Sequence, residues 1–169
     1  MQHLRIHSLL LFGMVVFGGV KMAVADVLYS FTTIDAPGVS STSAFGINAS
    51  GQIVGIFRDA LGAHGFLLDT GGSFTTIDVP GAGITTPSGI NDSGQIVGRY
   101  SDSAGQHGFL LDTAGSITTI DVPGASSTSA VGINNSGQIV GQYLDSTGVH
   151  GFLAMPVTGQ PRPFREFVR

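Results

Sequence analysis

The chain has 169 residues, no cysteine and a formal net charge of −4. Without cysteine it can form neither disulfide bonds nor thiolate metal sites, so its stability has to come from packing and backbone pairing. Between Asp26 and Gln160 the only cations are Arg58 and Arg99, against ten aspartates. Such a surface repels phosphate groups, which argues against nucleic acid as a partner.

The first 25 residues differ in kind from the rest. Arg5 precedes an apolar run over residues 9–17, and the stretch ends in Ala23-Val24-Ala25. A basic start, a short apolar core and a small-x-small ending predict a signal peptide over residues 1–25. The run is shorter than the roughly 20 apolar residues of a membrane span. We therefore predict export to the cell surface or beyond, with no membrane span after cleavage; a retained N-terminal anchor is the alternative.

From Phe31 onward, one block of sequence is written three times at a spacing of 43 residues. The segment Gly46-Ile47-Asn48 returns at 89 and 132, and His64-Gly65-Phe66-Leu67 returns at 107 and 150. A tandem period indicates one supersecondary unit that is copied and stacked. We predict a three-repeat β domain over residues 26–155, with repeats at about 31–73, 74–116 and 117–159, and a C-terminal tail over residues 156–169.

Each repeat is predicted to be a four-stranded antiparallel meander. In the middle copy, segments 88–90, 95–100, 107–111 and 116–120 are separated by short turns. These turns begin with Asn or Asp and have Gly in fourth place, as in Asn91-Asp92-Ser93-Gly94, which is typical of a type I turn closed by a glycine at positive φ. A longer crossover, from Asp78-Val79-Pro80-Gly81 to Pro87, separates one repeat from the next.

The predicted fold class is all-β, with the three meanders arranged as β-propeller-like blades. Three units are fewer than the four to eight blades of most propellers. A β-trefoil-like threefold closure is the alternative, and a homodimer that completes a six-unit ring is another arrangement. A further strand phrase stands before the first repeat, at residues 28–34, and could complete the last unit and so remove an exposed edge.

The phrase Gly-Ile-Asn-x-Ser-Gly-Gln-Ile-Val-Gly, followed by Asp-x-x-Gly-x-His-Gly-Phe-Leu, resembles the bacterial HAF-family extracellular repeat. The resemblance covers nearly all of residues 31–153 in three copies. The His-Ala-Phe that names the family corresponds to His64-Gly65-Phe66 and its two copies, with glycine in place of alanine. The resemblance implies a secreted or cell-surface repeat protein, and it lends no catalytic residues.

One histidine recurs in each repeat, and the three are the best candidates for a metal site: His64, His107 and His150. On a threefold axis they could form a His₃ site. No other ligand accompanies each histidine, so we instead expect hydrogen bonds to the backbone or to an aspartate across the hairpin. Those aspartates are Asp59, Asp102 and Asp145. No metal or other cofactor is predicted.

A second set of aspartates precedes the x-Pro-Gly turns: Asp35, Asp78 and Asp121. Carboxylates at such places could bind calcium between blades. The more common use is to accept backbone N–H groups in an Asx-turn, which is our expectation here.

No catalytic residues are predicted, because the serines, histidines and aspartates that the copies share recur at equivalent places. An active site needs one nucleophile, one base and one orienting group in mutual reach. The clearest non-repeated polar residues on the strands and their loops are Arg58, Arg99 and Gln142. The prediction is therefore that the chain is not an enzyme; the alternative is an exported hydrolase with a site at the ring axis.

The predicted function is that of an exported repeat domain with a structural or multivalent binding role. Repeated units favour repetitive ligands such as glycans or a cell-surface polymer. Three segments rich in Gly, Ser and Thr, at residues 38–43, 81–86 and 124–129, would offer hydroxyl groups to a sugar.

Overall fold

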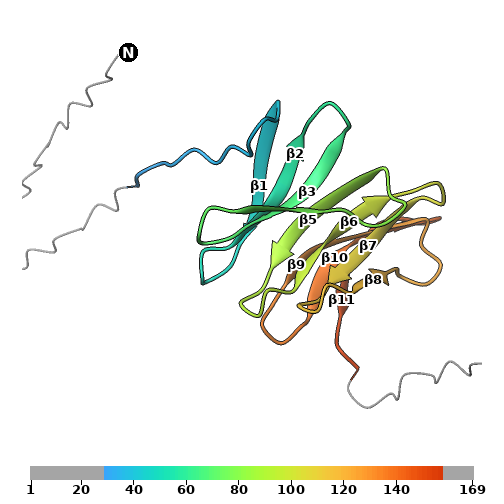
Figure 1. Ribbon diagram of the computed structural model, residues 1–169. Helices are drawn as coiled ribbons and strands as arrows, with labels where there is room; N and C mark the ends of the chain where they lie inside the picture. The colour runs from blue at the N-terminus through green and yellow to red at the C-terminus, as the bar shows by residue number, and fades with distance from the viewer. Residues whose placement is uncertain (1–28, 158–169) are drawn as a thin grey trace, which may run out of the picture. The chain divides into compact units, whose positions relative to one another are not determined.

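The computed structural model describes residues 29–157, and all the strands lie in a compact unit that begins at Thr33 (Figure 1). Eleven β-strands and no helix are formed by these residues, which confirms the all-β class. No helix long and apolar enough to cross a membrane occurs within residues 29–157. The predicted signal peptide and most of the predicted tail lie outside the described residues.

The strands follow the 43-residue period, but each of the first two meanders ends inside the next predicted repeat, because its fourth strand begins at Phe74 or at Ile117. A repeat is from here on one meander. The first sheet has the order β1 (Ser41–Ile47), β2 (Ile53–Arg58), β3 (Ala63–Leu68), β4 (Phe74–Ile77), and every neighbouring pair is antiparallel. The second repeat forms the same meander from β5 (Ile84–Ile90), β6 (Ile96–Ser101), β7 (Gln106–Leu111) and β8 (Ile117–Ile120). The third contributes β9 (Ser127–Ile133), β10 (Ile139–Asp145) and β11 (Gly148–Ala154). The four-stranded meander is thus present twice, and a three-stranded one follows.

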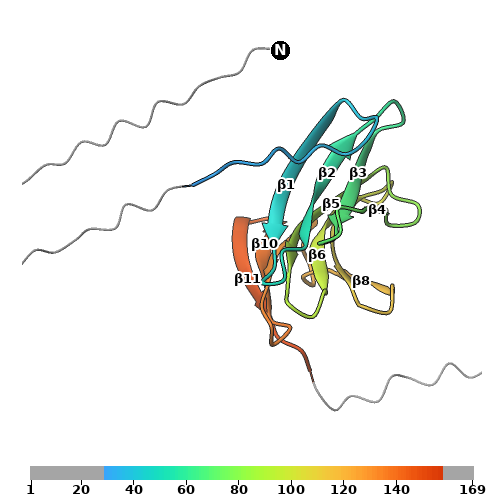
Figure 2. The same ribbon diagram turned by 60° about the vertical axis from the view of Figure 1, so that its left-hand side comes forward.

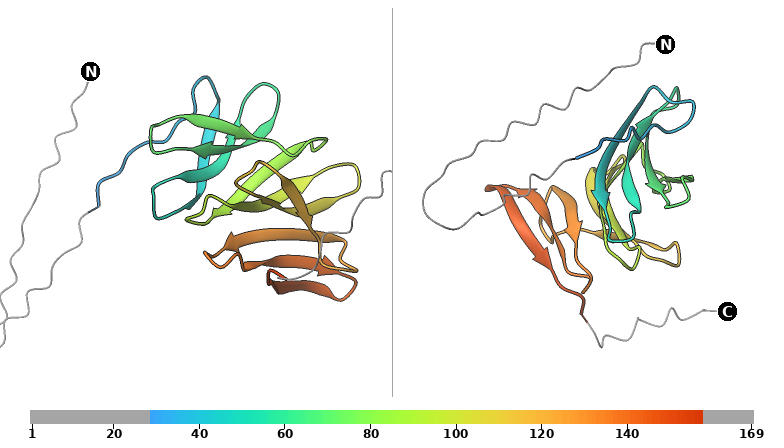
Figure 3. Two further views of the ribbon diagram at one scale, coloured as in Figure 1. Left: turned by 60° about the horizontal axis from the view of Figure 1, so that its bottom comes forward. Right: turned by 90° about the vertical axis from the view of Figure 1, so that its left-hand side faces the viewer.

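The three meanders succeed one another in space as in sequence, and the second and third are joined into one seven-stranded sheet, in which β8 pairs with β7 (Figures 2 and 3). Strand β5 packs against β1, β2 and β3, and β9 packs against β5, β6 and β7. A single parallel bridge, between Gln106 and Ser127, links the second meander to the third. A trefoil-type closure would require the first and third repeats to pack on each other, whereas the well-packed strand pairs join neighbouring repeats. The curled sheets form an open half-barrel (Figure 3).

The predicted hairpin turns are confirmed. In the middle repeat the N–H of Gly94 donates to the carbonyl oxygen of Asn91 at 3.0 Å, and Gly94 has a φ of 85°. A side chain at that φ would be strained, which is why glycine stands there. The side chain of Asn91 accepts the N–H groups of Ser93 and Gln95 at 3.1 and 2.9 Å. The side chain of Asn91 therefore stabilises the turn, and Gly94 adopts the positive φ that the turn requires.

The crossover between repeats is shorter than predicted. Strand β5 begins at Ile84, so residues 84–87, predicted to lie in the crossover, belong to the sheet. The hydroxyl of Thr85 accepts the N–H of Val79 at 2.9 Å, and both residues are buried. Because a buried N–H needs a partner, this bond holds the end of the crossover in an extended form.

The core lies between the sheets. Each sheet has a trailing face, which packs on the next repeat, and a leading face, which packs on the previous one. At the first junction the trailing face carries Val54, Leu67 and Ile77, and the leading face carries Ile90, Ile96 and Tyr100. At the second junction Val97, Leu110 and Ile120 meet Ile133 and Ile139. Each fully buried side chain of this size contributes about 1.5–3 kcal/mol.

Glycines in the first strand of each repeat allow this close packing. A Cβ on Gly46 would lie 2.8 Å from the carbonyl oxygen of Ser88, and one on Gly89 would lie 3.0 Å from that of Val131. The first distance is too short for a methyl group, and the second would require the third repeat to shift. The small residues predicted for a crowded inner strand are therefore required by the backbone of the next repeat.

Candidate functional site

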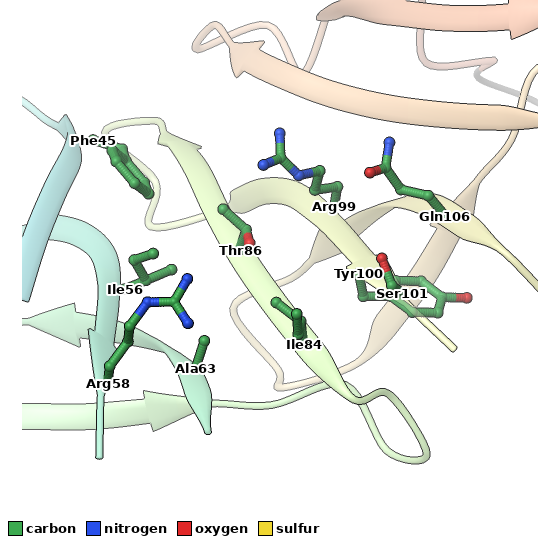
Figure 4. A pocket seen from close by; sticks show the side chains of 10 residues that line it. All are labelled: Phe45, Ile56, Arg58, Ala63, Ile84, Thr86, Arg99, Tyr100, Ser101 and Gln106. Atoms are coloured by element: carbon green, nitrogen blue, oxygen red, sulfur yellow. The ribbon is translucent and has the colours of Figure 1, made fainter. Parts of the chain in front are cut away.

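A groove of about 250 Å³ lies between the first and second sheets (Figure 4). Arg58 at the end of β2 and Phe45 on β1 line it from the first repeat. From the second repeat it is lined by Ile84 on β5, Arg99 and Ser101 on β6, and Gln106 on β7, among others. The groove therefore exists only because two repeats are stacked.

The two arginines give the groove its chemistry. They are the only lysine or arginine residues between 29 and 157, and both are exposed. Within that part of the chain, no carboxylate lies within 4.0 Å of either guanidinium group. Figure 4 shows Arg58 and Arg99 on either side of Thr86 of β5. Two unneutralised cations thus share one groove of an acidic protein.

Neither arginine is part of the repeat. The position of Arg58 is occupied by Ser101 in the second repeat and Leu144 in the third. The position of Arg99 is occupied by Ile56 and Gln142. Sequence analysis singled out Arg58, Arg99 and Gln142 as non-repeated, and the structure brings the first two to one groove. What the sequence lacked was the stacking that makes them neighbours.

Two other polar side chains of the groove, Tyr100 and Gln106, make hydrogen bonds within the protein. The hydroxyl of Tyr100 lies 3.0 Å from that of Thr119, and the Nε2 of Gln106 donates to the hydroxyl of Ser129 at 2.9 Å. These bonds hold the wall of the groove in place. The two guanidinium groups remain the charged groups available to a ligand.

The three candidate metal-binding histidines lie on β3, β7 and β11, one in each repeat, and each has its own protein partner. His64 Nδ1 is 2.9 Å from Oδ2 of Asp78, and His107 Nδ1 is 2.7 Å from Oδ2 of Asp121. His150 Nε2 is 2.9 Å from the hydroxyl of Thr147. Within residues 29–157, no three His, Cys, Asp or Glu side chains are grouped so as to hold a metal ion.

In the first two repeats the predicted aspartate lies at ion-pair distance from its histidine, and a second aspartate makes the shorter contact. Oδ1 of Asp59 is 3.5 Å from His64 Nε2, which makes no hydrogen bond. The register of β3 and β4 pairs Gly65 with Ile77 and so sets His64 opposite Asp78. Asp78 was instead predicted to form an Asx-turn or bind calcium. The constant spacing of 14 residues between the paired histidine and aspartate was the available signal.

The hydrogen bonds from Asp78 and Asp121 raise the pKa values of His64 and His107. In each case this bond is the largest cause that raises the pKa of the histidine above its ordinary value of 6.5. The pKa of Asp59 is lowered, first by the backbone N–H of Leu61. The ring of His64 also lies against Phe57, with centroids 5.4 Å apart. The arrangement fastens β3 to the end of β4, which is a structural role.

In the segments predicted to offer hydroxyl groups to a sugar, four hydroxyl-bearing residues of the second and third repeats are buried. Thr85 and Thr86 are buried at 2% and 7% exposure, and Thr128 and Ser129 are buried as well. Thr85 and Thr128 accept backbone N–H groups of their own crossovers. Their hydroxyl groups are therefore used by the fold.

No protein-family model and no curated protein matches the chain. Three solved structures resemble part of it. A streptogramin B lyase is 17% identical, with a TM-score of 0.37, over 68% of this chain and 41% of that one. Virginiamycin B lyase from Staphylococcus aureus is 16% identical, with a TM-score of 0.39, over 66% and 40%. A catalytically inactive variant of that lyase with quinupristin is 17% identical, with a TM-score of 0.37, over 64% of this chain and 40% of that one.

The chain spans about two-fifths of the length of these structures. All three are named as lyases, which contradicts the prediction that the chain is not an enzyme, and that prediction is not retained. At identities of 16% and 17%, no substrate and no residue role is carried over from them to this chain.

Proposed function

We propose that the protein is an exported repeat protein, related to the bacterial HAF-family extracellular repeats, that binds an acidic polysaccharide in the groove between its first two repeats. Its repeats would be blades of propeller type. The observation that carries the binding proposal is the pair Arg58 and Arg99, two exposed cations without a carboxylate partner in the described part of the chain.

The blade interpretation is supported by strand order and packing. β1 to β4 and β5 to β8 are antiparallel meanders in chain order. Blades of a propeller are four-stranded sheets of this kind, packed face to face around an axis. The small first strands, held close by Gly46 and Gly89, fit the inner position that such an axis requires.

Carboxylate groups on a sugar polymer match the charges of the groove. Guanidinium groups bind carboxylates through paired hydrogen bonds in a fixed geometry. The remaining surface carries an excess of aspartates and would repel a polyanion elsewhere. Binding would therefore be confined to the groove.

The apolar residues of the groove suit the faces of sugar rings. Phe45 is half exposed on one wall, and Ile84 is nearly as exposed on β5. Sugar ligands combine an apolar ring face with polar edges, and pockets for them pair apolar walls with a few polar groups. The groove offers both kinds of surface side by side.

The test is binding of the purified protein to polygalacturonate, with neutral dextran as the comparison, by isothermal titration calorimetry. Binding to the acidic polymer alone is expected, and it should weaken as salt is added. Arg58→Ala and Arg99→Ala should each weaken it roughly 10- to 100-fold, since a charged hydrogen bond contributes about 1.5–3 kcal/mol. Polymer length before and after incubation reports cleavage in the same samples.

The matched control is Gln142→Ala, which removes the residue that stands in the third repeat where Arg99 stands in the second. It should bind as the unchanged protein does. The proposal fails if no acidic polysaccharide binds, or if the two arginine variants bind as tightly as the control.

A further inference from the structure

The two outer repeats each leave one face of their sheet uncovered, and the two faces are of opposite kind. On trailing faces, Val54 and Val97 are fully buried by the next repeat, whereas their equivalent Val140 is 50% exposed. Leu153, the equivalent of Leu67 and Leu110, is 59% exposed. The third repeat thus presents to solvent the apolar surface that is core at both internal junctions.

The first repeat shows the complementary case. On leading faces, Ile90 is buried against the previous repeat and Ile133 packs in the second core, whereas their equivalent Ile47 is 67% exposed. The trailing face of the third repeat is thus exposed at Val140 and Leu153, and the leading face of the first repeat is exposed at Ile47, although its Phe66 is buried. Two junctions within the same molecule show that these two kinds of face pack together.

A missing strand points to the same arrangement. β4 pairs with β3 and β8 pairs with β7, but β11 pairs only with β10 among the described strands. The sequence Phe31-Thr32-Thr33-Ile34-Asp35 repeats that of β4 and the residue after it, yet in the structure these residues form no strand. Within residues 29–157, the third repeat thus has no fourth strand, and residues 31–35 have the sequence of a fourth strand but no strand partner.

The crossover that follows this unpaired segment is already in place. The N–H of Ala36 donates to the hydroxyl of Thr42 at 3.0 Å, as Val79 does to Thr85 and Val122 to Thr128. In the second and third repeats, this bond joins the fourth strand of one repeat to the first strand of the next. Residues 31–35 are therefore connected to β1 as the fourth strand of a preceding repeat would be.

We propose that two copies of the chain bind each other head to tail. The trailing face of the third repeat of one copy packs on the leading face of the first repeat of the other. Residues 31–35 of the second copy add the fourth strand to β11 of the first. By the register of β3 and β4, Thr32 stands opposite Leu153 and Ile34 opposite Gly151.

Side chains at the new junction match those of the internal ones. Phe31 is 96% exposed, whereas its equivalent Phe74 lies 5.2 Å from Phe66 between ring centroids. In the proposed pair, Phe31 meets Phe152, the equivalent of Phe66. The same register sets Asp35 opposite His150, as Asp78 stands opposite His64.

In a closed pair, the leading face of the first repeat and the trailing face of the third repeat are covered in both copies. A head-to-tail contact leaves free ends unless it closes into a ring. Two copies give six repeats, within the four to eight of known propellers, whereas three copies would give nine. The open half-barrel of one copy is completed by the other.

The first test is molecular mass in solution by sedimentation equilibrium. The unchanged protein is expected to be a dimer, and Leu153→Lys and Ile47→Lys are each expected to be monomers with an unchanged circular dichroism spectrum. An equimolar mixture of the two variants should form dimers again, since one copy keeps its leading face and the other its trailing face.

That mixture separates the proposal from its rivals. If like faces paired with like, one of the two variants would remain a dimer by itself. A monomer of the unchanged protein at all concentrations, or a mass that keeps growing beyond two copies, overturns the proposal. The groove variants Arg58→Ala and Arg99→Ala should remain dimers, so self-association and polysaccharide binding are tested separately.

The second test uses the absence of cysteine from the chain. Residues opposite each other in antiparallel strands are close enough for a disulfide. The double variant T32C/L153C should therefore give a covalent dimer on oxidation, whereas T32C/V149C, displaced by four residues along β11, should not. A disulfide within a single chain, or no disulfide in either variant, contradicts the proposed exchange.

Discussion

The second and third repeats have nearly the same sequence and opposite surroundings on their trailing faces. Val97 in the second is fully buried, and its equivalent Val140 in the third is half exposed. Asn91 is buried and bonds to the next repeat, whereas Asn134 is exposed. Equivalent positions therefore carry the same residue type whether or not they are buried. A trailing-face residue is buried where the next repeat packs on it.

The largest difference is expected for a charge placed on the two trailing faces. Val97→Asp puts a carboxylate into the second core and should lower the free energy of unfolding by about 3–5 kcal/mol, as an unpaired buried charge does. Val140→Asp should change it by less than about 0.5 kcal/mol, as surface substitutions do. Urea unfolding at concentrations where the chain is monomeric measures both, and equal losses would contradict the comparison.

A smaller difference is expected where backbones approach closely. A Cβ on Gly89 meets the third repeat at 3.0 Å, whereas one on Gly132 meets only the side chain of Val140, at 3.4 Å. Gly89→Val should therefore cost about 1–3 kcal/mol through overcrowding. Gly132→Val should leave monomer stability nearly unchanged, as measured by thermal unfolding. If Gly132→Val is as unstable as Gly89→Val, the inner strand of the third repeat is more crowded than described.

The third comparison is between Asn91 and Asn134, the asparagines that begin the first turn of the second and third repeats. Asn91 Nδ2 donates to the carbonyl oxygen of Asn134 at 3.2 Å and to Oε1 of Gln95 at 2.8 Å. Asn91→Asp keeps the acceptor that holds the turn but loses both donations, and should cost about 1–3 kcal/mol. Asn134→Asp should cost clearly less, since Asn134 is exposed and donates to no further repeat in the described chain. Chemical denaturation of the two variants side by side decides this.

The smallest effect is a pH dependence that belongs to the first two repeats. Because the pKa values of His64 and His107 are raised above 6.5, their pairs with Asp78 and Asp121 contribute fully below pH 6.5. That contribution is lost as pH rises through the raised pKa. Asp78→Asn and Asp121→Asn together should flatten this decline in unfolding free energy.

The control for the pH effect is His150→Gln in the third repeat, measured at concentrations where the chain is monomeric, because only in the proposed dimer does an aspartate equivalent to Asp78 stand opposite His150. Its stability should decline with pH as that of the unchanged protein does. A decline that survives in the double aspartate variant would assign the pH dependence to other groups.

Sequence patterns predicted the local structure well because local structure is determined by local chemistry. The period of 43 residues and the Asn-x-Ser-Gly motif located the strands and turns, as at Asn91 to Gly94. Predictions failed where a residue depends on a partner far along the chain. Thr85 looked like a loop hydroxyl and is buried against Val79, and Asp78 looked like a turn residue and binds His64.

The candidate groove could be predicted only in part. Arg58 and Arg99 stood out as exceptions to the repeat, which is a property of the sequence. That they line the same groove depends on how β2 and β6 are set by the stacking of two sheets, which a strand pattern does not contain. The sequence thus indicated which two residues are unusual, and only the packing of the first two repeats showed that they lie in one groove.

The bonds between Asn48 and Asn91 and between Asn91 and Asn134 have a consequence for how such chains can change over generations. In each, an amide Nδ2 donates at 3.2 Å to the carbonyl oxygen of the residue 43 positions later. The second repeat therefore accepts from the first repeat the same hydrogen bond that it donates to the third. A gene duplication that inserted one more whole repeat would meet matching groups on both sides, so the array could lengthen or shorten without a redesigned junction.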